Sequence, residues 1–294
     1  MEKISKSQVK LIRSLQIKKF RDELGLFVAE GEKCVAELRK RFELVYYIQT
    51  GLRADRTQTA EKPLPDLPLK RQEYMTLLAT PAEIEQMSGL KTPQGVIGVF
   101  KKPAVQVDLS PATSDKTQTA GDYREDLILV LDGIQDPGNL GTIIRTCDWF
   151  GVHDIFCSSD TADCYNPKVV QATMGALARV HIHYVDLPKW LEKSAPSQKG
   201  RGHIYGTLLD GKDMYEVLGN GGLINSDASL NDGMRKDVII MGNEGNGISP
   251  AVRKLITHPI RIPSYPKNAE TSESLNVSIA TAIVLAEFRR ARVN

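Results

Sequence analysis

The chain has 294 residues, of which 41% are hydrophobic and 25% are charged, and its net charge is +2 at pH 7. This composition is that of an ordinary soluble globular protein, and no apolar run approaches the roughly 18 residues of a membrane span. The opening MEKISKSQVK lacks the apolar core of a signal peptide, so we expect no secretion and no membrane.

Cysteine usage gives no sign of a metal site or a disulfide framework. The four cysteines form no CxxC pair, and the five histidines complete no ligand spacing. The sequence therefore predicts a protein of the reducing cytoplasm that holds no metal.

The first 21 residues carry a block of positive charge, with seven Lys or Arg against the single acid Glu2. A basic block of this kind either contacts phosphate or is the solvated face of a helix. The candidates for such phosphate contacts are Lys6, Lys10, Arg13, Lys18, Lys19 and Arg21.

Residues 1–100 predict a small α/β domain. A basic amphipathic helix comes first, and a short later helix is led by Thr80 as its cap and Pro81 in its first turn. The expected elements are a helix over 8–15, a strand over 26–31, a helix over 32–42, a strand over 43–50, a helix over 81–88 and a strand over 94–100.

Residues 101–126 are rich in Pro, Ser, Thr and Asp and show no sustained apolar period, which indicates an interdomain linker. A second domain follows over 127–294. It opens with LILVLDG, an unbroken apolar strand of the kind found in parallel sheets buried on both faces.

Strands and helices then alternate, which predicts a parallel α/β sheet. Strands are expected over 127–133, 154–158, 179–185, 203–209, 237–242 and 259–263, and helices over 140–151, 167–177, 187–193, 249–256 and from 271 to 290. Residues 217–236, rich in Gly, Asn and Asp, are expected to form a surface loop.

Three strand ends are rich in Gly and polar residues, namely 131–146, 241–249 and 261–276. Ligands of parallel sheets bind at such carboxyl ends. Each segment alone has a plain structural reading; for example, Asn139 could simply cap a helix. The spacing G-x-x-G-x-G reverses the dinucleotide fingerprint, and no Walker A motif is present.

The head of the last helix is unusually polar for such an apolar element. It carries Ser272, Ser274, Asn276 and Ser278, although one short polar side chain is enough for a cap. We expect Ser272 or Ser274 to be the cap, and the others to face either a ligand or a neighbouring part of the chain.

Taken together, the three segments resemble the SpoU family of RNA ribose 2′-O-methyltransferases, part of the SPOUT class. That family's motifs are matched in order by Asn139, Gly141 and Arg145, by Gly242, Asn243, Glu244 and Gly245, and by Ile262, Pro263, Ser274, Leu275, Asn276, Val277 and Ser278. The segments KKFRDELGLFVAEG and TPQGVIGVF resemble the small ribosomal-protein-like RNA-binding domain that precedes the catalytic domain in many members.

The resemblance implies a fold, a cofactor and partners. It implies a deep trefoil knot from about residue 204 onward, S-adenosylmethionine as cofactor, an rRNA or tRNA substrate, and a homodimer formed through the knotted domain. The implied catalytic residues are Asn139, Arg145, Glu244, Ser274 and Asn276. The implied cofactor-binding residues are Thr207, Leu208, Gly242, Asn243, Gly245, Ile262, Pro263 and Leu275.

The resemblance implies Arg145 as the group that takes the proton of the 2′-hydroxyl. A guanidinium is effectively always protonated, so Arg145 is better suited to hold a phosphate, and Glu244 is the chemically easier base. Two alternatives to a SpoU-type enzyme stay open at this point: a catalytically inactive RNA-binding module, and a Rossmann-type methyltransferase.

Overall fold

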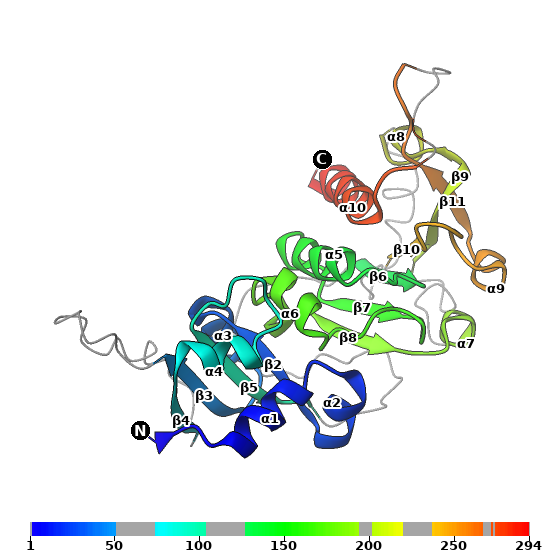
Figure 1. Cartoon of the computed structure of the whole chain (residues 1–294). Helices are drawn as coiled ribbons and strands as arrows, with labels where there is room; N and C mark the ends of the chain where they lie inside the picture. The colour runs from blue at the N-terminus through cyan, green and yellow to red at the C-terminus, as the bar shows by residue number, and fades with distance from the viewer. Residues whose placement is uncertain are drawn as a thin grey trace, which may run out of the picture. The chain divides into compact units, whose positions relative to one another are not determined.

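In a computed structural model the described residues are 2–50, 74–103, 127–193, 202–219, 237–266, 272 and 274–293. The chain divides into two compact units (Figure 1). The first comprises Met1–Val105 together with Asp163–Arg179, and the second comprises Gln106–Ala162 together with Val180–Asn294.

The first unit is built on a mixed five-stranded sheet of order β1-β4-β3-β5-β2. Strand β5 pairs antiparallel with β2 and β3, while β4 pairs parallel with β3 and β1. The strands are β1 (Glu2–Lys3), β2 (Leu26–Glu30), β3 (Leu44–Thr50), β4 (Met75–Ala79) and β5 (Val96–Lys101). The helices from this part of the chain are α1 (Lys6–Ser14), α2 (Lys18–Leu24), α3 (Glu32–Leu38) and α4 (Pro81–Met87).

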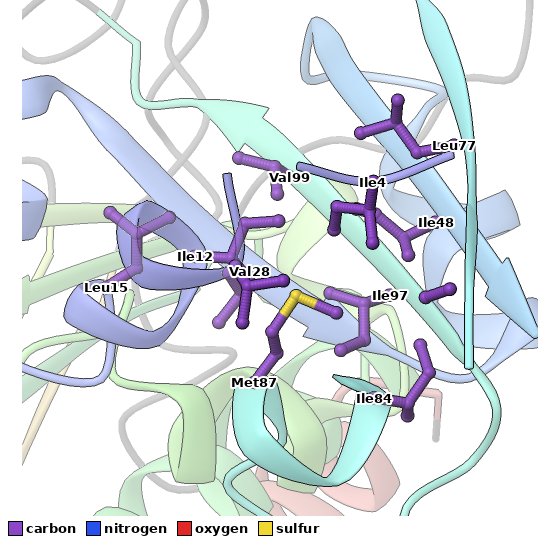
Figure 2. Packing of buried hydrophobic residues seen from close by; sticks show 12 residues of the cluster. Ile4, Ile12, Leu15, Val28, Ile48, Leu77, Ile84, Met87, Ile97 and Val99 are labelled. Carbon is purple, nitrogen blue, oxygen red and sulfur yellow. The ribbon is translucent and has the colours of Figure 1, made fainter. Parts of the chain in front are cut away.

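Capping boxes start two of these helices. Ser5 and Gln8 exchange hydrogen bonds at the start of α1, and Thr80 and Glu83 do so at the start of α4, where Thr80 was the predicted cap. The apolar faces of α1 and α4 then pack together with side chains of the sheet (Figure 2). The labelled core residues are Ile4, Ile12, Leu15, Val28, Ile48, Leu77, Ile84, Met87, Ile97 and Val99.

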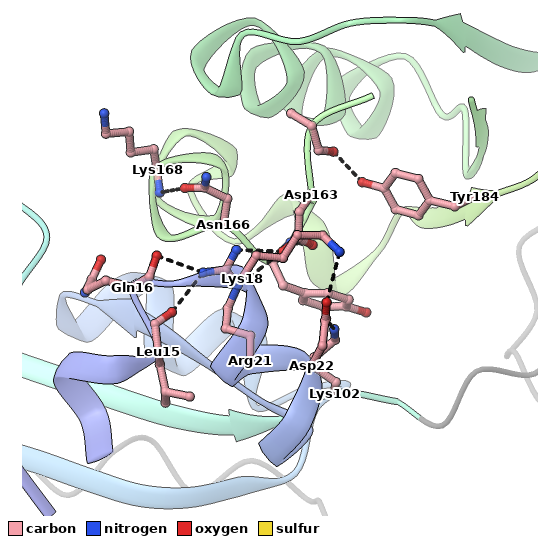
Figure 3. A network of polar contacts seen from close by, with 12 residues as sticks. Leu15, Gln16, Lys18, Arg21, Asp22, Lys102, Asp163, Asn166, Lys168 and Tyr184 are labelled. Carbon is pink, nitrogen blue, oxygen red and sulfur yellow. Dashed lines mark hydrogen bonds and ion pairs between the residues drawn. The ribbon is translucent and has the colours of Figure 1, made fainter. Parts of the chain in front are cut away.

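A segment from the middle of the chain completes the first unit. Residues 163–179 hold α6 (Pro167–Thr173) and the 3₁₀ turn η1 (Ala176–Ala178). Their anchor is Arg21, only 1% exposed, whose guanidinium donates to Asp163 Oδ2 from Nε (3.2 Å) and Nη2 (2.7 Å) (Figure 3). Arg21 Nη1 also donates to the carbonyls of Leu15 and Gln16.

The second unit is a six-stranded sheet of order β11-β9-β10-β6-β7-β8 in which every pair is parallel. Its strands are β6 (Leu127–Asp132), β7 (Asp154–Cys157), β8 (His181–Tyr184), β9 (Ile204–Asp213), β10 (Asp237–Gly242) and β11 (His258–Arg261). Its helices are α5 (Pro137–Trp149), α7 (Leu187–Lys193), α8 (Met214–Gly219), α9 (Pro250–Arg253) and α10 (Val277–Val293). Helix α10 packs against α5, and α7 against α9.

The prediction of an α/β protein with a parallel C-terminal sheet and a small N-terminal α/β unit is confirmed. Helices α2 and α8 and strands β1 and β4 were missed. Helix α8 takes up the first three residues of the expected loop over 217–236, and the rest of that loop lies outside the described residues. Helix α10 begins at Val277, later than the predicted 271.

The domain limits 1–100, 101–126 and 127–294 stay a prediction, since residues 104–126 lie outside the described part. The trefoil knot also stays a prediction, because its expected path crosses residues 220–236 and 267–271, which the structure does not describe.

Within the described ranges, no helix has both the length and the apolar character to cross a bilayer. Among the same residues, no group of three or more His, Cys, Asp or Glu side chains is placed to hold a metal ion. The four cysteines lie within the described residues, are buried and form no disulfide. Burial, with a smaller effect of Glu37, raises the pKa of Cys34 to about 11. A thiol in that state is a poor nucleophile at neutral pH.

Candidate active site

Polar side chains from three segments meet at the carboxyl ends of β6 and β10. Asn139 lies in the first turn of α5, Glu244 lies in the turn after β10, and Asn276 directly precedes α10. Asn276 Nδ2 donates to Asn139 Oδ1 at 2.9 Å, and Asn139 Nδ2 donates to Glu244 Oε1 at 2.7 Å. Glu244 lies 105 positions from Asn139 in the chain, and Asn276 lies 137 positions from it. The two hydrogen bonds join these three distant residues into one row.

Asp136 leaves the side chain of Asn139 available for this row. It caps α5 by accepting the Asn139 backbone N–H at 2.8 Å, and Pro137 follows in the first turn. The plain reading of Asn139 as the helix cap is therefore wrong. The pair Asp136-Pro137 is the sequence signal that could have identified the true cap.

The turn that carries Glu244 is fixed by Asn243. Its backbone exchanges two 2.9 Å hydrogen bonds with Gly247, and its Oδ1 accepts the N–H groups of Gly245 and Asn246. Its Nδ2 donates to the Gly133 carbonyl at 2.7 Å, which ties the turn to the end of β6. Gly247 has a φ of +67°, a conformation that favours glycine. Glu244 is therefore exposed to solvent on a turn whose backbone is held by several hydrogen bonds.

Asn276 caps α10, so the expectation that Ser272 or Ser274 does so is wrong. Asn276 Oδ1 accepts the N–H groups of Ser278 at 3.0 Å and Ile279 at 3.4 Å, and the Ser278 hydroxyl at 2.6 Å. Asn276 thus uses its carbonyl for the helix and its amide for Asn139.

Arg145 and Ser274 do not take part in this row. Both are exposed, and no hydrogen bond or ion pair joins either side chain to a residue that the structure describes. Arg145 lies six residues beyond Asn139 on α5, which is about 9 Å along the helix axis. It is therefore separate from the hydrogen-bonded row.

Two of the eight residues predicted to bind the cofactor lie within β9, directly after its pairing with β10, and the others lie at or after the ends of β10 and β11 and just before α10. On β9 the register jumps: Gly206 pairs with Pro259, but Lys212 pairs with Ile260, so 207–211 bulge out of the ladder. This bulge carries Thr207, whose hydroxyl donates to the Ile240 carbonyl at 3.1 Å, and Leu208.

The same end of the sheet has exposed apolar surface that suits a nucleoside. Leu275 is 51% exposed, and Ile262 and Pro263 are half-buried. A Cβ on Gly245 would meet only Asn243 Oδ1, at 3.6 Å, so a ligand can approach the backbone there closely. These features fit a cofactor with an apolar base held against the backbone.

Comparison with known proteins supports the same reading of the chain. A model described as the SpoU rRNA Methylase family matches residues 126–286, more than half of the chain. The chain belongs to the SpoU rRNA methylase family. A second model, described as the MRM3-like substrate binding domain, matches residues 6–98. The resemblance that the three motifs predicted is therefore confirmed.

Two curated relatives are similar to this chain over two thirds or more of its length. The Bacillus subtilis 23S rRNA (guanosine(2553)-2′-O)-methyltransferase RlmP is 28% identical over 290 residues, which is 98% of each chain. The Neisseria meningitidis 23S rRNA (guanosine-2′-O-)-methyltransferase RlmB is 31% identical over 68% of this chain and 70% of its own.

Solved structures match over almost the whole length. A protein of the TrmH family of RNA methyltransferases from Porphyromonas gingivalis is 32% identical with a TM-score of 0.72, covering 98% of each chain. An AdoMet-bound rRNA methyltransferase from Sinorhizobium meliloti is 25% identical with a TM-score of 0.71, covering 99% of this chain and 97% of its own.

In the first unit of this SpoU-family chain, five of the six predicted RNA-contacting cations are exposed. Lys6, Lys10 and Arg13 have the spacing of one face of α1. Lys18 and Lys19 lie on α2, where each pairs with an acid one turn later. Arg21 is the exception: it is buried in the Asp163 ion pair and cannot reach RNA, so its assignment was wrong.

Proposed function

We propose that the chain transfers a methyl group from S-adenosylmethionine to the ribose 2′-hydroxyl of an rRNA nucleotide. Membership of the SpoU rRNA methylase family makes it an RNA methyltransferase. The row Asn276–Asn139–Glu244 supports ribose chemistry, because it offers an exposed carboxylate, held in place, to accept a hydroxyl proton. The 2′-O-methyltransferases of Bacillus subtilis and Neisseria meningitidis support both the ribose and the rRNA assignment.

The cofactor would lie against the middle of β9 and the ends of β10 and β11. Backbone of the 207–211 bulge, the turn at Gly242 and Gly245, and the surface formed by Ile262, Pro263 and Leu275 would hold it. When bound, S-adenosylmethionine supplies an electrophilic methyl carbon on a sulfonium sulfur. AdoMet bound to the Sinorhizobium meliloti protein supports this choice of cofactor.

Residues of the chain accept the proton of the 2′-hydroxyl and stabilise the negative charge that develops on its oxygen. Glu244 accepts the proton of the 2′-hydroxyl through its second oxygen, since Asn139 already occupies Oε1. The guanidinium of Arg145 holds the neighbouring phosphate and stabilises charge that develops on the attacking oxygen. Ser274, exposed just before the cap of α10, contacts the bound ribose.

The site of methylation on the nucleotide tests this proposal directly. Purified protein is incubated with S-adenosylmethionine carrying a labelled methyl group and with unmodified rRNA, and the product is digested to nucleosides for mass spectrometry. The methyl is expected on the sugar fragment. A methylated base would refute ribose methylation, and RNA bound without any label would indicate an inactive RNA-binding module.

We also propose that α1 contacts RNA phosphates through Lys6, Lys10 and Arg13. Replacing all three with Gln should flatten the dependence of log K on log salt by about 0.7–0.9 per lost contact. Binding is measured by filter retention or fluorescence anisotropy between about 50 and 200 mM salt. Substitutions suit this test better than removal of residues 1–100, because removal would uncover α6 and its anchor Asp163.

The matched control is Lys33→Gln with Lys91→Gln, which neutralises two exposed lysines elsewhere in the same unit. The control should keep the wild-type salt slope. An unchanged slope in the α1 variant would mean that these charges are only a solvated helix face.

A homodimer and a cytoplasmic location complete the proposal. Trp149 at the end of α5 is 85% exposed and Ile279 on the neighbouring α10 is 55% exposed, which is unusual for large apolar side chains. We propose that two copies meet through these helices, and sedimentation equilibrium of the purified chain tests this. Cell fractionation tests the location.

A further inference from the structure

In the row of hydrogen bonds at the start of α10, the backbone determines which atom of each side chain donates and which accepts. The N–H groups of Ser278 and Ile279 can only donate, and both face the same atom of the Asn276 side chain. The oxygen and nitrogen of an Asn side chain are told apart by their hydrogen bonds, so the atom that accepts both N–H groups must be the carbonyl oxygen Oδ1. The amide nitrogen of Asn276 is therefore turned outward, toward Asn139.

The orientation of the Asn276 amide in turn determines the orientation of the Asn139 amide. Asn139 receives the Asn276 amide on its own Oδ1, at 2.9 Å, so its Nδ2 is the atom that faces Glu244. This Nδ2 donates to Glu244 Oε1 at 2.7 Å, so that oxygen has to be an acceptor without a proton. Both amide orientations thus follow from two backbone N–H groups of α10.

We infer that the cap of α10 holds Glu244 as a proton acceptor by fixing the direction of the row Asn276–Asn139–Glu244. This inference rests on the proposed function and deepens it. Asn276 is then a positioning residue and not a catalytic one.

Ser278 joins Asn276 as a second positioning residue. Its side chain is buried, and its hydroxyl donates to Asn276 Oδ1 at 2.6 Å. A hydroxyl can donate or accept, so this bond holds the Asn276 side chain in place, while the two backbone N–H groups determine which amide atom faces the helix. Sequence motifs alone mark Ser278 without showing this role.

Other charged groups on the surrounding elements are compatible with this inference. Asp136 on α5 accepts the Asn139 N–H, and Asp132 at the end of β6 accepts the Ser249 N–H. Asp160 follows β7 and lies beside Gly133, and Arg145 is exposed on α5. All four are unchanged in the variants below, so a difference in pH profile reports the change at position 276 or 278.

Asn276→Asp is the decisive variant, because Asp caps helices as well as Asn but cannot donate from its second oxygen. Asn139 must then turn its amide toward the new carboxylate, and its carbonyl faces Glu244. A carboxyl group facing a carbonyl is stabilised in its protonated form. We expect the acidic limb of the pH profile for single-turnover methylation to move up by about one pH unit or more, so that the rate on that limb falls about tenfold or more. The rate should return toward wild type at high pH.

Two further variants complete the test. Asn276→Ser keeps a capping oxygen but is too short to reach Asn139, and it should lose rate equally at every pH. Ser278→Ala keeps both backbone donors, so it should leave the acidic limb near its wild-type position. Melting temperature and equilibrium binding of S-adenosylmethionine should stay near wild type in all three.

A wild-type pH profile in Asn276→Asp overturns the inference, and so does a loss that is the same at every pH. Failure of the proposed function looks different: the wild-type protein itself would then place no methyl on ribose.

Discussion

Glu244→Gln should lower the single-turnover rate of methyl transfer by about a hundredfold or more. The glutamine carbonyl can still accept the Asn139 amide at the position of Oε1, so the geometry of the row is kept. What is lost is a group able to take the proton of the 2′-hydroxyl, and such a group contributes roughly 10²–10⁴ in rate. The rate is measured at saturating S-adenosylmethionine, and affinity for the cofactor should change little.

Glu192→Gln is the matched control, since it makes the same change at an exposed site on α7 and should keep the wild-type rate. If Arg145 were the group that takes the proton, Glu244→Gln would stay within about threefold of wild type. Arg145→Ala would then be the variant with the large loss.

Arg21→Met should destabilise the protein by about 3–5 kcal/mol, the usual cost of breaking a buried ion pair by removing one partner. The variant leaves the Asp163 carboxylate without its partner and the carbonyls of Leu15 and Gln16 without their donor. Urea unfolding measures the effect as a fall in the midpoint.

Arg13→Met is the control, because Arg13 is exposed and a surface change of this kind is usually within about 0.5 kcal/mol. Adding Asp163→Asn to Arg21→Met should recover part of the loss, since the remaining group is then neutral. A stable Arg21→Met protein with weakened RNA binding would mean that Arg21 contacts RNA after all.

The strands of the second sheet could be predicted because each is marked by the hydrophobicity of its own residues. Strands β6 and β10 are buried along their length, and a strand buried on both faces needs an unbroken apolar run. The candidate site could be predicted as three strand ends, because parallel strands bring their carboxyl ends to one edge.

The roles within the site could not be predicted in the same way. Ser272, Ser274 and Asn276 are nearly equal as caps, so only the position of the first helical turn distinguishes them. The bulge over 207–211 depends on the pairing of β9 with β11, which lies about fifty residues further along the chain. No local period records such a pairing.

The role of the charged residue Arg21 could not be predicted from its neighbours in the sequence either. The sequence places it in a basic block, beside Lys18 and Lys19, and nothing local separates it from them. Its burial depends on Asp163, which lies 142 positions away. A charge count therefore cannot tell a contact with RNA from an internal ion pair.

The return of residues 163–179 to the first unit also sets an order of events during synthesis. Strand β5 ends at Lys101, but α6 and the partner of Arg21 are made only after β6, α5 and β7. At ~5–20 residues per second, the first unit waits several seconds on the ribosome with Arg21 unpaired. Its folding is therefore tied to translation of the second unit, and a nascent chain stopped before residue 163 should be an easy substrate for proteases.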